Sequence, residues 1–170
     1  MNISNLKTGD KAPEIVLAII EIPEGSGVKY ELDKDTGLIM ADRFLHGANV
    51  FPFNYGFIAG TMSRDGDPVD VIVLSSATMT PGTGIKVRPI GMLEMEDEEG
   101  MDAKIIAAPI EKVDPFYSHV KDIADIDKPT KMKIKHFFDT YKLLEKGKWV
   151  KTGNFVGKDK AFEEINEGMK

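Results

Sequence analysis

The sequence contains no cysteine. Disulfide bonds, thiolate nucleophiles and thiolate metal ligands are therefore excluded, and we expect a cytoplasmic protein. Long apolar runs are also absent. The densest, residues 15–20, has the length of a buried strand and falls short of the about 20 residues that a membrane-spanning helix needs. The N-terminal region has no basic flank followed by an apolar segment, so we expect neither a signal peptide nor a membrane partner.

Basic residues are fewer than acidic ones, which gives a net charge of −6 at pH 7. This charge disfavours nucleic acid as a partner, because nucleic-acid binding requires a basic surface. The chain has 170 residues, of which 42% are hydrophobic, and shows no repeat, low-complexity tract or linker. We therefore expect a single domain over residues 1–170, long enough to bury a core.

Short strands are predicted in the first two-thirds of the chain and helices in the last third. Segments rich in Ile and Val predict strands at 15–22, 29–33, 54–58, 69–74, 85–95 and 103–110. Capping and periodicity predict helices that begin at Asp114-Pro115 and that span 129–145 and 158–167. Evenly spaced strands without intervening helices indicate a mainly β, α+β fold: a small antiparallel barrel or strongly curled sheet with helices packed outside.

Charged residues interrupt three of the apolar strands. Because side chains alternate between the two faces of a strand, Lys29 shares a face with Glu31, and Asp102 shares one with Lys104. Glu21 ends the apolar run in the same manner. Any single pair is explained as a solvated outer face, but their occurrence on three strands near two acidic loops favours a polar site.

The first acidic loop contains Asp65, Asp67 and Asp70 and leads directly into the apolar strand 71–74. Two carboxylates about 4 Å apart repel each other by roughly 4 kcal/mol at an effective dielectric constant near 20. Such a cluster requires a cation, raised pKa values or free solvent. Oxygen ligands without cysteine and with few histidines indicate a hard ion, Mg²⁺, Mn²⁺ or Ca²⁺, rather than Zn²⁺.

An EF-hand does not fit this loop. Counted from Asp65, the positions that require an acid, a glycine and a glutamate hold Val69, Asp70 and Ser76. A polar hairpin turn explains Asp65-Gly66 but not Asp70.

The second acidic stretch, residues 94–102, carries the acids Glu94, Glu96, Asp97, Glu98, Glu99 and Asp102. Most are typical of a solvated hairpin tip. Asp97 and Asp102 flank that tip and could face the first loop.

A set of basic and phenolic residues directs the hypothesis toward phosphate: Lys29, Arg43, Tyr55, Lys104, Tyr141 and Lys142. A tetra-anionic substrate bound through Mg²⁺ requires cationic side chains on its outer oxygens, and arginine can bind them bidentately. Tyrosine hydroxyls add neutral donors. Lysine beside tyrosine at the end of an amphipathic helix would be ordinary in isolation.

In order and spacing, these residues resemble the family I soluble inorganic pyrophosphatases of the bacterial type over nearly the whole chain. The resemblance is carried by 20–23, 29–31, 42–44, 54–56, 65–70, 97, 102–104 and 136–150. The loop 65–70 corresponds to the signature of that family. The implied fold is a closed five-stranded barrel of the OB-like kind with flanking helices.

The resemblance implies a role for each candidate residue. Asp65, Asp70 and Asp102 would bind the activating pair of Mg²⁺ ions. Asp97 and Glu21 would complete the metal and water coordination as further ions arrive with the substrate, and Asp67 would be the general base. The phosphoryl oxygens would be held by Lys29, Arg43, Tyr55, Lys104, Tyr141 and Lys142. Glu31 would orient its neighbours by hydrogen bonds.

The resemblance also implies Mg²⁺-dependent hydrolysis of pyrophosphate by a homohexamer, with several ions per site and Mn²⁺ as a substitute. A metal-activated water would attack in line, without a covalent intermediate, so His46, His119 and His136 are expected to be structural or surface residues. Phe51 and Phe57 stand where many relatives carry tyrosine. We expect this departure to change substrate hydrogen bonding modestly.

Three alternatives remain at this stage. A small barrel that binds oligonucleotides without catalysis would need a basic groove with exposed aromatic rings, which an acidic chain does not favour. A metal-binding module with an inactive site would not need the basic set. A hydrolase of nucleotides or longer polyphosphates would be expected to show a Walker loop or a base-stacking pocket, and the sequence indicates neither.

Overall fold

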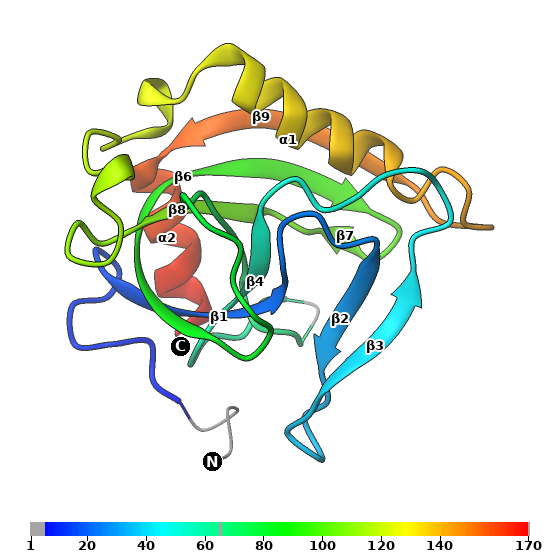
Figure 1. Ribbon diagram of the computed structural model, residues 1–170, viewed down its shortest axis with the longest axis horizontal. Coiled ribbons are helices and arrows are strands. Elements are labelled where there is room, and N and C mark those ends of the chain that lie inside the picture. The colour runs from blue at the N-terminus through cyan, green and yellow to red at the C-terminus, as the bar shows by residue number, and fades with distance from the viewer. Residues whose placement is uncertain (1–5, 65, 170) are drawn as a thin grey trace.

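Five strands form a closed barrel in the computed structural model, which describes residues 6–64 and 66–169. Around the ring, neighbouring strands pair in the order β1 (Val16–Ile22), β4 (Asn54–Ile58), β5 (Asp70–Val73), β8 (Lys104–Pro109) and β6 (Gly84–Asp97). The ring closes because β6 also pairs with β1 (Figure 1). The predicted mainly β fold, a small closed five-stranded barrel with flanking helices, is confirmed.

One pair of barrel strands is parallel. β5 and β8 run in the same direction, with Val71 opposite Ile105, whereas the other four pairs of the ring are antiparallel. The expectation of a wholly antiparallel barrel is therefore wrong at this pair. The reason is geometric: strand direction cannot alternate all the way around a closed ring with an odd number of members. The long excursion through β6 supplies the connection that a parallel pair needs.

In the described part of the chain, four strands lie outside the ring, and three of them were not predicted from the sequence. β2 (Val28–Leu32) pairs with the unpredicted β3 (Ile39–Phe44) in a separate two-stranded sheet, at the right of Figure 1. The unpredicted β9 (Val150–Gly157) extends the barrel sheet along β6, and the short β7 (Gly100–Met101) pairs with the end of β6.

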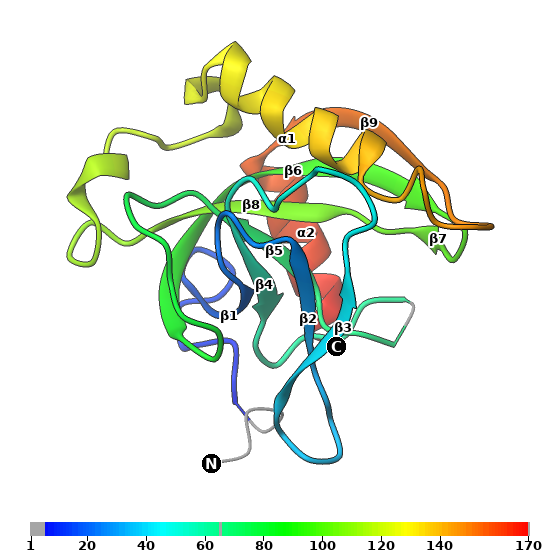
Figure 2. The same ribbon diagram turned by 45° about the vertical axis from the view of Figure 1, so that its right-hand side comes forward.

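The two α-helices cover the barrel. α1 (Lys128–Thr140) lies along β9 in both views, and α2 (Lys158–Gly168) packs on β6 and β9 (Figures 1 and 2). Among the residues that the structure describes, two short 3₁₀ helices, η2 (Pro115–Tyr117) and η3 (Ile123–Asp125), precede α1. The helix expected at Asp114-Pro115 is thus a single turn. Among the described residues, no helix combines the length and apolarity that crossing a membrane would require.

The predicted helix over 129–145 ends earlier, at Thr140. The next residues form hydrogen-bonded turns, in which the N–H of Glu145 donates to the carbonyl oxygen of Lys142 at 2.9 Å. Tyr141 is the C-cap residue of α1 and keeps helical dihedral angles, whereas Lys142 belongs to the turns that follow.

Barrel strand β5 is buried on both faces, which explains its unbroken apolar sequence. Val71 and Val73 pack in a cluster that includes Ile165 of α2, whereas Ile72 packs in a second cluster with Phe137 of α1. Burial of apolar surface contributes about 25 cal/mol per Å² to the free energy of folding. Both clusters therefore pack against β5, whose first residue lies at one end of the barrel.

Candidate active site

A cavity of about 510 Å³ is lined by residues from the barrel, from the β2–β3 sheet and from the turn after α1. Asp65 lies outside the described residues. Every other residue to which the sequence assigned a role lines this one cavity: Glu21, Lys29, Glu31, Arg43, Tyr55, Asp67, Asp70, Asp97, Asp102, Lys104, Tyr141 and Lys142. None of the three histidines lines it, and all three are exposed, as expected for surface residues.

The parallel pair of strands positions the centre of the site. Asp70 is the first residue of β5 and Lys104 is the first residue of β8. Because Val71 lies opposite Ile105 in a parallel register, these two first residues lie side by side at the same edge of the barrel. Asp102 precedes Lys104 by two residues, so its side chain is directed to the same place.

Lys104 bridges the two aspartates. Its Nζ donates to Oδ2 of Asp70 at 2.5 Å and also to Oδ1 of Asp102. Only 3% of Lys104 is exposed. Burial alone would lower the pKa of Lys104, but the two carboxylates more than compensate and raise it. The ammonium group is therefore a permanent cation within the carboxylate cluster.

Lys104 alone does not balance the carboxylates that surround Asp70. Burial, reinforced by the charge of Asp70, raises the pKa of Glu21 to about 8 and that of Asp102 to about 6. Raised carboxyl pKa values indicate excess negative charge in a desolvated place, where a further cation would be stabilised. Because the donors are all oxygen atoms, the set fits a hard divalent ion.

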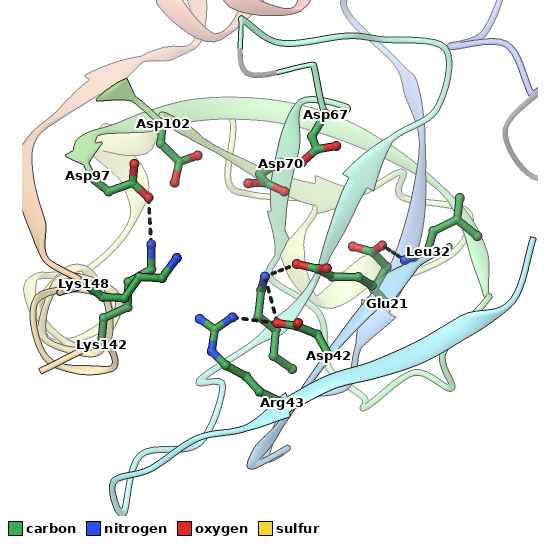
Figure 3. Close-up of polar contacts among 12 residues, drawn as sticks. Glu21, Leu32, Asp42, Arg43, Asp67, Asp70, Asp97, Asp102, Lys142 and Lys148 are labelled. Atoms are coloured by element: carbon green, nitrogen blue, oxygen red, sulfur yellow. Dashed lines mark hydrogen bonds and ion pairs between the residues drawn. The ribbon is translucent and has the colours of Figure 1, made fainter. Parts of the chain in front are cut away.

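The described residues do not form a closed metal cage as they stand. Among them, no three carboxylate or imidazole groups are arranged to hold a metal ion, and the ammonium of Lys104 bonds both Asp70 and Asp102. Figure 3 shows Asp70, Asp97 and Asp102 directing their carboxylates toward the space that Arg43 and Lys142 face.

A second ion pair joins the end of β6 to the turn after α1. Nζ of Lys142 lies 2.8 Å from Oδ2 of Asp97, and both residues are buried. Glu98 accepts from Lys148 at 2.8 Å. Although desolvation alone would raise the pKa of Glu98, Lys148 and backbone hydrogen bonds lower it to about 2. This wall of the cavity therefore carries paired charges.

The β2–β3 sheet supplies the opposite cations. Lys29 lies directly across from Arg43 in the antiparallel register. Nζ of Lys29 bonds Glu31 and lies 3.5 Å from Asp42, whose Oδ2 accepts from Nη1 of Arg43 at 2.6 Å (Figure 3). Glu31 thus contacts Lys29 directly in the folded chain.

Two buried tyrosines supply neutral donors. Burial, with a contribution from nearby aspartates, raises the pKa of Tyr55 and of Tyr141, so both hydroxyl groups stay protonated at neutral pH. The ring of Phe51 lies 5.5 Å from that of Tyr55 and packs in the core, whereas Phe57 forms an apolar part of the cavity wall.

Sequence reasoning assigned no role to four charged residues of the cavity: Lys34, Asp42, Glu99 and Lys148. Nζ of Lys34 donates to Oδ1 of Asp67 at 2.6 Å and to the carbonyl oxygen of Gly66 at 3.0 Å. Asp42 lies where the register of β3 against β2 shifts, so regular strand alternation, which would place it on the face opposite Arg43, does not find it. Lys34 lies in the connection between β2 and β3, and no local pattern distinguishes it from a solvated turn lysine.

Comparison with known proteins agrees with this geometry. The family model for inorganic pyrophosphatases matches residues 18–170. The inorganic pyrophosphatase of Aquifex pyrophilus is 54% identical over 169 residues, which are 99% of this chain and 96% of that protein. That of Helicobacter pylori strain 26695 is 49% identical over 170 residues, 100% of this chain and 98% of the relative.

Solved structures give the same result. The crystal structure of inorganic pyrophosphatase from Thermus thermophilus superposes with a TM-score of 0.96 at 47% identity, covering 99% of this chain and 97% of that one. The Helicobacter pylori enzyme superposes with a TM-score of 0.93 at 48% identity, covering 97% and 96%. The chain therefore belongs to the inorganic pyrophosphatase family.

Proposed function

We propose that this chain is a Mg²⁺-dependent inorganic diphosphatase that hydrolyses pyrophosphate to two orthophosphates. One observation carries the proposal: carboxylates from three barrel strands and cations from the β2–β3 sheet and the turn after α1 line the same cavity. Carboxylates suit divalent ions, and lysine and arginine suit phosphoryl oxygens. The family and the names of the relatives support the same activity.

The residues that would hold the metal are Asp70 and Asp102, together with Asp65, which lies outside the described residues. Asp97 and Glu21 would complete the coordination as further ions enter with the substrate. When bound, Mg²⁺ supplies a water molecule of lowered pKa and charge that neutralises the leaving phosphate, and Mn²⁺ would substitute. The ammonium of Lys104 would have to leave the space between Asp70 and Asp102, and from there it can bind a phosphoryl oxygen.

Proton transfer is assigned to Asp67. Its Oδ1 accepts a hydrogen bond from Lys34, and both side chains lie at the exposed rim of the cavity. In this role Asp67 takes the proton of the attacking water, which then attacks one phosphorus atom in line. Since no serine, cysteine or histidine lines the cavity, among the described residues no such nucleophile is placed to form a covalent intermediate.

The remaining side chains of the cavity bind the substrate: Lys29, Arg43, Tyr55, Lys104, Tyr141 and Lys142. Their donors are fixed before the substrate arrives, because each is buried or ion-paired in the folded chain. Preorganised positive charge lowers the barrier to phosphoryl transfer, in which negative charge moves onto the leaving oxygen. Glu31 orients Lys29.

We further propose that the enzyme is a cytoplasmic homohexamer. The absence of cysteine supports the location. Large apolar side chains left exposed on the single chain, including Phe44 at 70%, Leu143 at 70% and Leu144 at 68%, support assembly. Light scattering of the purified protein measures the assembled mass; a monomer at working concentration contradicts this part.

The activity is tested by measuring phosphate release from pyrophosphate, triphosphate and ATP, with Mg²⁺ and with a chelator. The proposal predicts rapid release from pyrophosphate, much slower release from the other two, and none with the chelator. Release from ATP at an equal rate would instead indicate a nucleotide hydrolase. No release from any of the three, combined with salt-sensitive binding of an oligonucleotide, would indicate a nucleic-acid-binding barrel.

A further inference from the structure

Arg43 is held by a carboxylate that has no part in the chemistry proposed above. Its Nε donates to Oε1 of Glu145 at 3.0 Å. The side chain of Glu145 is only 8% exposed, although the residue lies in a turn. Taking a carboxylate out of water is costly unless a well-placed cation compensates. The burial of Glu145 therefore depends on Arg43, and the position of Arg43 depends in turn on Glu145.

The pair joins two parts of the molecule that the sheet does not join. Arg43 lies on β3, which together with β2 forms a sheet separate from the barrel. Glu145 lies in the turn that also carries Tyr141 and Lys142, and its N–H donates to the carbonyl oxygen of Lys142 at 2.9 Å. Lys142 is fixed to the barrel through Asp97. The ion pair thus fixes Arg43 relative to Lys142.

Two contacts determine the orientation of a planar guanidinium group. Glu145 accepts a hydrogen bond from Nε, and Asp42 accepts one from Nη1 at 2.6 Å. Nη2 has no hydrogen-bond partner among the described residues, while Arg43 lines the cavity. Because the guanidinium is rigid, fixing two nitrogens also fixes the direction of the third. Glu145 itself does not line the cavity.

We propose that Glu145 is a positioning residue for pyrophosphate hydrolysis: it orients Arg43 so that the remaining donors of the guanidinium meet a phosphoryl oxygen at a fixed place relative to Lys142. This inference rests on the proposed function. Displacement of a substrate-binding group by about 1 Å can lower the rate by up to a hundredfold, so the effect of losing Glu145 is measurable without contact between Glu145 and the substrate.

The first test is the substitution Glu145→Gln, which keeps the size of the side chain and removes its charge. We expect kcat/KM for magnesium pyrophosphate to fall about tenfold and KM to rise at least about threefold. A smaller folded fraction alone would lower kcat and leave KM unchanged. Glu111→Gln is the matched control, because Glu111 is exposed, does not line the cavity and removes the same charge.

A double-mutant cycle separates positioning from general structural support. We expect Glu145→Gln to change kcat/KM by less than about twofold when Arg43 is already replaced by alanine, because Glu145 acts only through Arg43. Equal effects of Glu145→Gln in the presence and absence of Arg43 would overturn the inference. If Glu145→Gln does not fold, the cycle is made with Glu145→Asp, which keeps the charge and shortens the side chain.

A readout independent of activity is the NMR signal of the Arg43 Nε–H group in the chain without metal or substrate. The wild-type protein should give a slowly exchanging signal that Glu145→Gln shifts or broadens, while Glu111→Gln leaves it unchanged. An unchanged signal in Glu145→Gln would overturn the inference.

If the wild-type chain releases no phosphate, the proposed function fails and the inference fails with it. Failure of the cycle or of the NMR test in an active enzyme refutes the inference alone.

Discussion

Asp70 and Lys104 begin two neighbouring parallel strands of the barrel, and their side chains meet with Oδ2 and Nζ 2.5 Å apart. The parallel pairing makes this meeting possible, because it brings the first residues of both strands to the same edge. The same ammonium group bonds Asp102. In the chain without metal, Lys104 therefore supplies the positive charge that the aspartates need.

Replacement of Lys104 by glutamine should destabilise the metal-free protein more than the metal-bound one. The substitution leaves two partly buried carboxylates without a cation, which typically costs about 3 kcal/mol of unfolding free energy. Bound Mg²⁺ replaces the missing charge and should offset much of that loss. Urea unfolding with chelator and with Mg²⁺ measures both values.

Lys86→Gln serves as the control, because Lys86 is exposed on β6 and does not line the cavity. An equal loss of stability for Lys104→Gln with and without Mg²⁺ contradicts a charge-balancing role for Lys104.

Asp67→Asn should bind divalent ions and lose most of its turnover. The amide retains the shape of the side chain but cannot accept the proton of the attacking water, and general-base catalysis typically contributes about 10²- to 10⁴-fold. Calorimetric titration with Mg²⁺ measures binding, and phosphate release measures turnover. Turnover within about threefold of the wild type would rule out the assignment of the base. Asp10→Asn, an exposed position away from the cavity, is the matched control.

Gly56→Ala should disrupt the barrel next to Tyr55. A Cβ atom at Gly56 would lie 1.9 Å from the carbonyl oxygen of Ile19, so β4 and β1 would have to separate. Overpacking typically costs about 1–3 kcal/mol, and a clash with backbone belongs at or above the upper end of that range. Thermal unfolding measures the loss. Gly47→Ala, whose new methyl group would meet its nearest neighbour at 3.8 Å, should unfold close to the wild-type temperature.

Asp127, the N-cap residue of α1, should contribute to the loss of folding stability in acid. Hydrogen bonds from Thr130 lower the pKa of Asp127 in the folded chain. This stabilisation is present above the unfolded pKa, about 3.9, and is lost as the pH falls through the lower folded value. Asp127→Asn caps the helix without titrating. Melting temperatures measured from about pH 7 to pH 3 should therefore fall less steeply for Asp127→Asn. Parallel curves contradict the prediction.

Most barrel strands could be predicted from the sequence because they are apolar and are bounded by clear turn residues. The strand over 54–58 was predicted with the observed ends. β3 was missed because Asp42 and Arg43 give it a polar, largely exposed sequence, and β9 was missed because glycine interrupts it. Side chains alternate between the two faces in the same way in parallel and antiparallel strands. The parallel pairing of β5 with β8 therefore could not be predicted from the sequence pattern alone.

The residues of the site were predicted more completely than their contacts. Alternation on the strands and the resemblance to a known family identified most of the charged residues that line the cavity, but not Lys34, Asp42, Glu99 or Lys148. The pairing of Lys104 with both aspartates and of Arg43 with Glu145 depends on tertiary packing, as does the early end of α1. Helical periodicity continues past Thr140. Only the packed structure shows that the helix ends there, with Tyr141 as its C-cap and Lys142 in the following turn, and that both line the cavity.

The most direct test of a metal site built from these carboxylates is the anomalous-scattering map of crystals grown with Mn²⁺. We expect peaks in the cavity at about 2.1–2.4 Å from carboxylate oxygens of Asp70 and Asp102, with the ammonium of Lys104 withdrawn from between them. A fully occupied Mn²⁺ site elsewhere, with Lys104 still bonded to both aspartates in an active enzyme, would contradict this expectation.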